Sequence, residues 1–109
     1  MITWEDFEKI DIRAGTIVKV EHFEKAKKPA FKLWVDLGPL GTKTSSAQIT
    51  VHYNVSELVG KQVVCIVNFP PKQIANFISE VLVTGFPDDN KNVVLTSIDK
   101  RVENGAKLF

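Results

Sequence analysis

The string NFPPKQIANFISEVLVTG, in the second half of the 109-residue chain, joins two apolar runs through amides, charges and a pair of prolines. A hairpin between two strands needs only a two-residue turn. Here Pro70 and Pro71 fix φ and remove two backbone donors, so a strand must end there and the chain leaves in one rigid direction. Rigid presentation reduces the entropy lost on binding. The side chains that this string could offer to a ligand are Asn68, Lys72, Gln73, Asn76, Ser79 and Glu80.

Glu80 is the one acidic residue of that string. A carboxylate in such a setting needs a basic or amide partner, and we expect Asn68 or Arg13 to supply it. Two interpretations remain open for Asn68, Ser79 and Glu80. They form either a structural hydrogen-bond cluster that shapes the turn or a direct contact with a ligand.

A second set of polar side chains lies on two expected neighbouring strands, residues 31–37 and 42–50. A lysine suits phosphate, an aromatic plane suits a base, and hydroxyls or amides suit sugars and base edges. Stacking of a base on an aromatic ring contributes about 1–3 kcal/mol, which makes Trp34 the most informative member. Trp34 could instead cover the outer surface or pack in a subunit interface. The set comprises Lys32, Trp34, Lys43, Ser45, Ser46 and Gln48.

The same surface could hold a peptide, because large apolar side chains outside a core need a partner that covers them. The candidates, if they prove exposed, are Phe23, Trp34, Phe77 and Phe86. Lys25, Lys27 and Lys28, in the preceding loop, could attract a polyanion at long range. As an exposed run they could equally have no role.

No pattern indicates catalysis, a metal site or a cofactor. His22 and His52 have no nearby cysteine and lack metal-ligand spacing, and there is no glycine-rich phosphate loop. Asp88 and Asp89 fall in an expected turn and do not read as a catalytic carboxylate pair. We therefore expect a binding protein without catalytic residues, metal ligands or cofactors.

The net charge of +1 hides an uneven distribution. Residues 1–24 carry three basic and six acidic side chains, residues 25–72 carry seven lysines and two acids, and residues 73–109 carry four basic and five acidic side chains. A basic middle third can form an anion-binding patch if its strands share a face. Otherwise these lysines are solvated on strand exteriors.

Apolar runs are short, and none approaches the roughly 20 residues that span a bilayer. The first residues lack the pattern of a secretory signal. A single cysteine, Cys65, cannot form an internal disulfide and suits a reducing compartment. We expect a cytoplasmic protein that does not insert into membranes.

The elements that must position these residues are mostly strands. Thr3 and Asp6 predict an N-cap and a short helix that ends near Lys9. From Asp11 the period becomes two, and Gly15 inside that strand predicts a bulge or a bend. The residues expected on one face of it are Ile12, Ala14, Thr16, Val18 and Val20.

The later strands are expected instead from near-continuous apolar runs of strand length. We expect further strands over residues 61–69, 78–86 and 93–98, and a helical turn over 53–60 with Ser56 as its cap. An Asn104-Gly105 turn precedes the tail. The length allows one core, so we expect a single domain, 1–109, of the all-β class, built as a small closed barrel or a sandwich.

Several strings together resemble the tRNA-binding domain family: FEKIDIRAGTIVKVE, PAFKLWVDLG, SSAQIT, LVGKQVVCIVNFPPKQIANFISEVLVTG and NGAKLF. Its members include the C-terminal domain of many methionyl-tRNA synthetases and the endothelial-monocyte-activating cytokine domain. The likeness covers about residues 5–108 and is greatest to the CsaA-type export chaperones. It implies a five-stranded OB-fold barrel, with a short N-terminal helix and extra C-terminal strands, assembled as a homodimer.

The resemblance also implies binding of tRNA by shape and, for the CsaA-type branch, binding of unfolded or export-bound polypeptides. The tRNA-binding members typically have Pro-Arg-Lys where this chain has Pro71-Lys72-Gln73, and glycine where it has Asn76. Gly-Met usually follows the Ser-Glu pair, where this chain has Val81-Leu82. The loss of one cation implies weaker phosphate binding. The alternative is therefore a peptide-binding export chaperone with only weak, non-physiological RNA binding.

Overall fold

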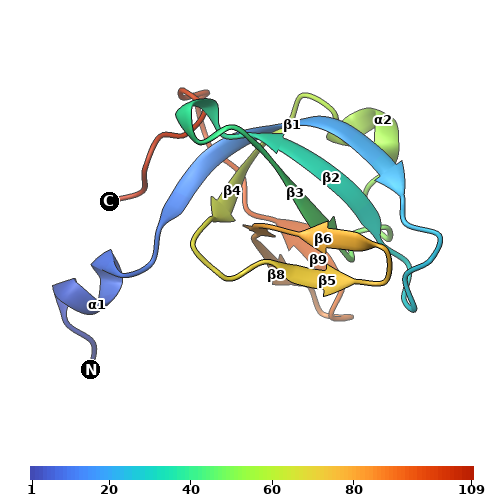
Figure 1. Cartoon of the computed structure of the whole chain (residues 1–109), viewed down its shortest axis with the longest axis horizontal. Coiled ribbons are helices and arrows are strands. Elements are labelled where there is room, and N and C mark those ends of the chain that lie inside the picture. Colours follow the sequence, from blue (N-terminus) through green and yellow to red (C-terminus); the bar gives the residue numbers. More distant parts are fainter.

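Five antiparallel strands form one curved sheet that nearly closes into a barrel (Figure 1). The computed structural model describes residues 1–109. The sheet order is β3-β2-β1-β4-β7. The bounds of these strands are β1 Ile12–His22, β2 Phe31–Asp36, β3 Thr42–Ala47, β4 Gln62–Ile66 and β7 Leu82–Val83. The expected five-stranded OB-type barrel with a short N-terminal helix is confirmed.

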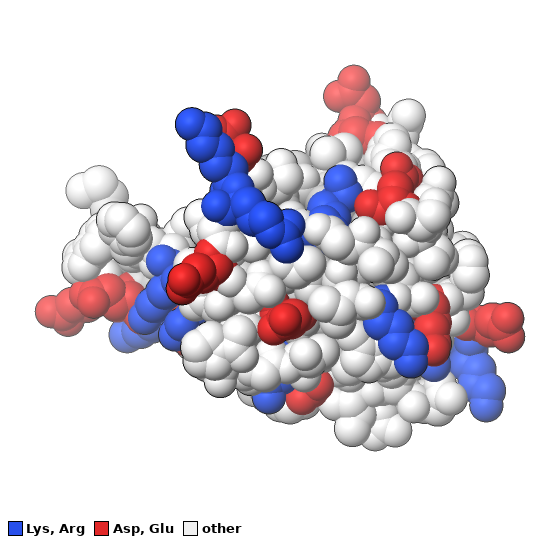
Figure 2. Space-filling model, turned by 90° about the horizontal axis from the view of Figure 1, so that it is seen from above, with Lys and Arg blue, Asp and Glu red and all other residues white.

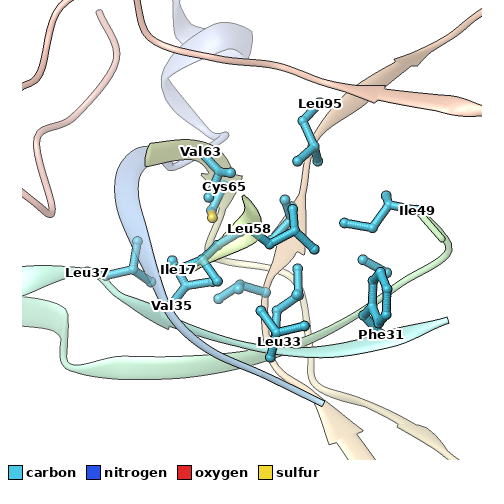
Figure 3. Packing of buried hydrophobic residues seen from close by; sticks show 14 residues of the cluster. Ile17, Phe31, Leu33, Val35, Leu37, Ile49, Leu58, Val63, Cys65 and Leu95 are labelled. Carbon is cyan, nitrogen blue, oxygen red and sulfur yellow. The ribbon is translucent and has the colours of Figure 1, made fainter. Parts of the chain in front are cut away.

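The core lies inside the barrel, and strict alternation along β2 builds one wall of it. Phe31, Leu33 and Val35 are at most 2% exposed, whereas the residues between them are half-buried on the outer face. Burial of each such side chain contributes about 1.5–3 kcal/mol. Figure 3 shows these side chains meeting others from β1, β4, α2 and β9, including Leu58 and Val63. Apolar residues at every second position of β2 thus supply this wall of the core.

The expected face assignment on β1 is wrong beyond Thr16. Ile17 is fully buried, whereas Val18 is 46% exposed. The pairing with β2 shifts between Ile17 and Lys19, so one extra residue reverses the alternation. The bulge therefore lies at Val18 and not at the expected glycine. Gly15 instead permits close approach, because a Cβ there would lie 2.5 Å from Cγ1 of Val35.

The bulge lets one long strand serve two neighbours. Residues 12–16 of β1 pair with β4, and residues 16–22 pair with β2. A bulged strand bends and twists more strongly than a regular one, which is what closure of a small barrel requires.

The single strand expected over 78–86 is divided among three sheets. β6 (Phe77–Ser79) pairs with β5 (Lys72–Ile74), β7 pairs with β4, and β8 (Gly85–Pro87) pairs with β9 (Val93–Leu95). Periodicity could not show this, because a continuous apolar run has the same pattern whichever strand it pairs with. Gly85 permits the sharp change of sheet, since a Cβ there would lie 2.5 Å from Cγ1 of Val93.

The helices are short, and their caps explain where they begin. In α1 (Trp4–Glu8), the Thr3 side chain accepts from the Asp6 N–H, and the Asp6 carboxylate accepts from the Thr3 N–H, as expected. In α2 (Val55–Leu58), Asn54 forms the cap, and not the expected Ser56. A 3₁₀ turn, η1 (Gly38–Leu40), joins β2 to β3. None of these helices has the length and apolarity needed to cross a membrane.

Both ends of the chain lie on the same side of the barrel (Figure 1). The helix α1 projects from the barrel and buries none of its residues. The tail runs along the start of β1, where Ala14 donates to the Ala106 carbonyl (2.9 Å) and Leu108 donates to the Ile12 carbonyl (2.8 Å). The expected turn at Asn104-Gly105 is present, and Gly105 has φ 90°.

Candidate nucleic-acid interface

Thr44 on β3 forms the seam at which the barrel closes. Its carbonyl accepts from the N–H groups of Glu80 (2.8 Å) and Val81 (3.1 Å). Its own N–H donates to Oε1 of Glu80 (3.1 Å). Its hydroxyl lies 2.9 Å from the same oxygen and 2.7 Å from the Ile78 carbonyl, and it can donate to either. One residue thus connects β3 to the segment between β6 and β7.

The prediction that Asn68 or Arg13 pairs with Glu80 is therefore wrong. The carboxylate is satisfied by Thr44, and not by Asn68 or Arg13. Next to it, the Ser79 hydroxyl accepts from the Ser46 N–H (3.0 Å). Ser79 and Glu80 thus make structural hydrogen bonds, which favours the interpretation of a structural cluster over that of direct ligand contact. These bonds cross the seam, however, and do not shape the turn.

Asn68 has a separate structural role at the other end of the seam. Its amide donates to the Lys9 carbonyl (2.7 Å), and its oxygen accepts from the Asp11 N–H (3.0 Å). Arg13 instead pairs with Asp11 at 2.6 Å, and this hydrogen bond holds the pKa of the Asp11 carboxyl below its usual value. Asn68 thereby fixes the point at which α1 leaves the barrel.

Three aromatic rings hold the β5–β6 hairpin against the outer face. Phe77, which is 9% exposed, lies edge-on to Phe23 (centroids 5.5 Å apart) and to Trp34 (5.8 Å). Such edge-to-face pairs stabilise by about 0.5–1.5 kcal/mol beyond area burial. Of the four aromatic residues considered for peptide binding, only Phe86 is largely exposed, at 69%.

Trp34 does not present an open stacking platform in this arrangement. It is half-buried, Phe77 packs against it, and Nζ of Lys19 lies 4.6 Å from its ring centroid. Lys32 is held in the same way, with Nζ 5.0 Å from the Phe23 centroid and 5.3 Å from that of Phe77. This geometry favours the interpretation in which Trp34 covers the outer surface of the barrel.

The loop that carries three lysines is fixed at both ends. Phe23 and Ala30 are buried in the same aromatic cluster, and the Phe23 N–H donates to the Ala30 carbonyl (3.0 Å). Lys25, Lys27 and Lys28 are all exposed, and none of them forms a salt bridge. The ammonium groups are therefore available to an anion.

A groove of about 390 Å³ lies between this loop, the end of β3 and the tip of the hairpin, and we call it the lysine hollow. The three lysines line it without any acidic residue, and Ser46, Gln48 and Ala75 supply its other walls. Cationic and uncharged polar groups on one concave surface suit a phosphate backbone. Two of the predicted site residues, Ser46 and Gln48, thus meet lysines that the sequence analysis left open.

A second depression, the apolar hollow, continues from Ser46 along the seam with a volume of about 410 Å³. It is lined by Lys72, Ser79 and Glu80 together with Phe69 and Leu82, which are 54% and 47% exposed. The end hollow, about 330 Å³, shares Phe69 and Glu80 with it and includes Lys43 and Asn68.

The seam therefore collects most of the predicted residues, with clear exceptions. Ser45 is 1% exposed and faces the barrel interior, so it cannot contact a ligand on the outer face. Gln73 and Asn76 are exposed on the hairpin, but neither lines one of these three hollows. The Gln73 amide instead donates to the Ala75 carbonyl (3.2 Å).

Charge elsewhere on the surface is mixed. On the upper side of the molecule, drawn in Figure 2, basic and acidic side chains are interspersed. Burial raises the pKa of the Cys65 thiol to about 12, so it stays protonated and unreactive at neutral pH. No three His, Cys, Asp or Glu side chains gather closely enough to hold a metal ion.

The sequence and the fold are similar to those of known proteins. The model of the tRNA binding domain matches residues 12–107. The chain belongs to the tRNA-binding domain family. Methionine–tRNA ligase of Methanocaldococcus jannaschii is 39% identical over 101 residues, which cover 93% of this chain and 15% of the ligase. The chain spans only about 15% of the length of the curated relatives that it matches.

Among solved structures, this tRNA-binding domain is similar over its whole length to two CsaA chaperones. That of Picrophilus torridus shares 52% identity with a TM-score of 0.93, and the two chains cover each other completely. That of Bacillus anthracis shares 47% identity with a TM-score of 0.94, over 100% of this chain and 99% of the other. The expected likeness to the CsaA-type branch is confirmed.

For a tRNA-binding domain, the residues that the sequence analysis left out are informative. Thr44 lies among four predicted site residues in the string TKTSSAQ, yet nothing in that string distinguishes the threonine at the seam from its neighbours. Phe69 and Leu82 resemble core residues by type, and only their exposure shows otherwise. Lys25, Lys27 and Lys28 could be noticed in the sequence, because a cluster of lysines in one loop indicates a site that could attract a polyanion.

Replacement of the seam hydroxyl tests this account of closure. Thr44→Val keeps the side-chain shape but removes the donor to Ile78 and Glu80, so we expect a loss of about 1–2 kcal/mol in the free energy of unfolding, measured by urea denaturation. Thr42→Val is the matched control: it is exposed on the same strand and should change stability by less than about 0.5 kcal/mol. Equal losses in the two variants would show that the seam bond does not stabilise the barrel.

Proposed function

We propose that this chain is a non-catalytic, homodimeric, cytoplasmic tRNA-binding protein of the CsaA type, with chaperone activity towards unfolded or export-bound polypeptides. Membership of the tRNA-binding domain family supports the RNA partner. The two CsaA chaperones that match over the whole length support the chaperone activity. A single free cysteine, buried in the core, is compatible with a reducing compartment.

The lysine hollow is the observation that carries tRNA binding. Its three cations have no acidic partner, and a loop pinned by buried Phe23 and Ala30 holds them. Phosphates provide most of the affinity of an RNA ligand, while fixed positions of the cations match a particular backbone shape. Ser46 and Gln48 provide polar groups for sugars or base edges on the opposite wall.

A titration with tRNA at about 50 and about 200 mM salt tests this function, because phosphate neutralisation releases counterions. We expect affinity to fall steeply with salt. The combined variant Lys25→Ala, Lys27→Ala, Lys28→Ala should bind more weakly, and its salt slope should shrink by about one for each lost phosphate contact. Lys100→Ala removes an exposed lysine outside the hollow and should leave the slope unchanged. No binding at low salt, or binding that is flat across salt, would refute the function.

The apolar hollow favours the chaperone activity as a second function of the same molecule. Phe69 and Leu82 lie on its wall, and Ile78 on the adjoining strand β6 is 54% exposed. Apolar side chains grouped on a surface mark a site for an apolar partner. Lys72 also lines this hollow, and its flexible side chain imposes no fixed hydrogen-bond geometry, so clients of many sequences could bind.

A light-scattering assay with an unfolding client protein measures this activity. We expect the protein to slow aggregation and the double variant Phe69→Ser, Leu82→Ser to lose most of the protection, because its hollow no longer buries apolar side chains. Phe86→Ser is the matched control, since Phe86 is 69% exposed but lies on β8 outside the hollow. Protection should vary little with salt. The second function is excluded if the unaltered protein gives no protection, or if the control loses as much.

Uncovered apolar residues at the two ends of the chain support the homodimer. Trp4 is 65% exposed on α1, and Phe109 is fully exposed beside a depression of about 290 Å³ that we call the C-terminal hollow. Acidic residues follow Trp4 on α1, while Arg13 and Lys107 line the hollow. The exposed Trp4 ring with its acidic neighbours and an apolar hollow edged by basic side chains are complementary, and a two-fold axis would use each pair twice.

Analytical ultracentrifugation at micromolar concentration tests the assembly. We expect a dimer, and Trp4→Asp should shift it to a monomer because a charge would enter the apolar contact. Val59→Asp changes an exposed apolar residue, 49% accessible, that lies away from both ends of the chain and should leave the dimer intact. A monomer of the unaltered chain would contradict the proposal.

A further inference from the structure

A larger pocket lies on the other side of the lysine-bearing loop, and we call it the loop pocket. Its volume is about 970 Å³, and its walls are the loop 23–30 and the segment 50–56. Pockets for small organic ligands typically enclose about 300–1,000 Å³. Lys27 lines both the loop pocket and the lysine hollow, so a ligand could pass from one to the other over this side chain.

Two aromatic side chains of the loop pocket are held in place from behind. His22 is exposed, and its ring lies 5.1 Å from that of Phe31, which is 2% exposed. Tyr53 is half-buried, and its hydroxyl accepts from the Leu95 N–H (2.9 Å). Rings supported in this way lose little freedom when a planar ligand packs on them, and histidine and tyrosine are both used to stack unpaired bases.

The polar groups of the loop pocket suit the edge of a base. The Asn54 oxygen caps α2, which leaves its amide N–H groups free to donate. The Thr50 hydroxyl forms no hydrogen bond within the chain and can donate or accept. Glu24 is the only acidic residue on the wall and can accept from an exocyclic amine of a base. An apolar peptide side chain would leave these groups unpaired.

The charges around the loop pocket determine how a nucleotide would be oriented in it. Glu24 repels a phosphate inside the pocket, whereas Lys25 and Lys28, which line the lysine hollow and not the loop pocket, attract one on the far side of the loop. The uncharged base and its phosphates are therefore directed to opposite sides of the same loop.

We propose that the loop pocket binds an unpaired nucleotide base of an RNA, while the lysine hollow holds the adjoining phosphates. This inference rests on the proposed tRNA binding and adds to it a requirement for an unpaired segment. Binding by backbone shape alone needs no such segment.

The test compares two single-stranded RNA hexamers, one with bases and one abasic at every position but with the same phosphates. We expect the full-length protein to bind the hexamer with bases more tightly. His22→Ala should weaken that binding roughly tenfold, by loss of stacking, and leave abasic binding unchanged. Lys27→Ala should weaken both. His22→Phe keeps a flat ring and should restore most of the affinity, which separates stacking from any general loss of structure.

Circular dichroism confirms that each variant is folded. Equal affinity for the two hexamers, or no effect of His22→Ala, overturns the inference, and tRNA binding that remains salt-dependent in the same samples leaves the proposed function intact. If tRNA itself does not bind at low salt, the proposed function fails as well.

Discussion

Closure of the barrel is centred on one residue of β3, Thr44, which forms most of the hydrogen bonds across the seam. Thr44 accepts two backbone hydrogen bonds from Glu80 and Val81, and it returns its own N–H to the Glu80 carboxylate. A β3 without this seam would be an open edge, with its outward backbone groups exposed to water. The same contact fixes where β6 ends and β7 begins, so it determines the floor of both the apolar hollow and the end hollow.

The aromatic cluster complements the seam from the outer face. Phe77 of the β5–β6 hairpin packs between Phe23 and Trp34. It thereby joins the hairpin both to β2, through Trp34, and to the lysine-bearing loop, which begins at Phe23. These rings use the outer face of β2 for packing, which would otherwise be the stacking surface of an OB-type barrel. Ligand-accessible groups are consequently displaced to the rim, where the loop 23–30 and the hairpin tip meet Ser46 and Gln48.

Sequence analysis succeeded where a pattern had one structural meaning. The alternation along β2 fits only one arrangement, with its apolar side chains in the core. The five quoted strings together indicated a family whose fold is confirmed. It failed where pairing partners decide the outcome. The bulge at Val18 reversed the faces of β1 with no residue type to mark it, and a continuous apolar run concealed two changes of sheet. Ser45 shows the same difficulty, since a hydroxyl on a polar strand gives no sign of facing the core.

The paired prolines before β5 have a further consequence for contacts between this protein and other polypeptide chains. β5 pairs only with β6, so one edge of this three-residue strand faces outward. Pro70 and Pro71 offer no N–H, and the strand cannot lengthen in that direction. A neighbouring polypeptide that lined up along this edge would find few donors there, so this edge is a poor template for a growing intermolecular sheet.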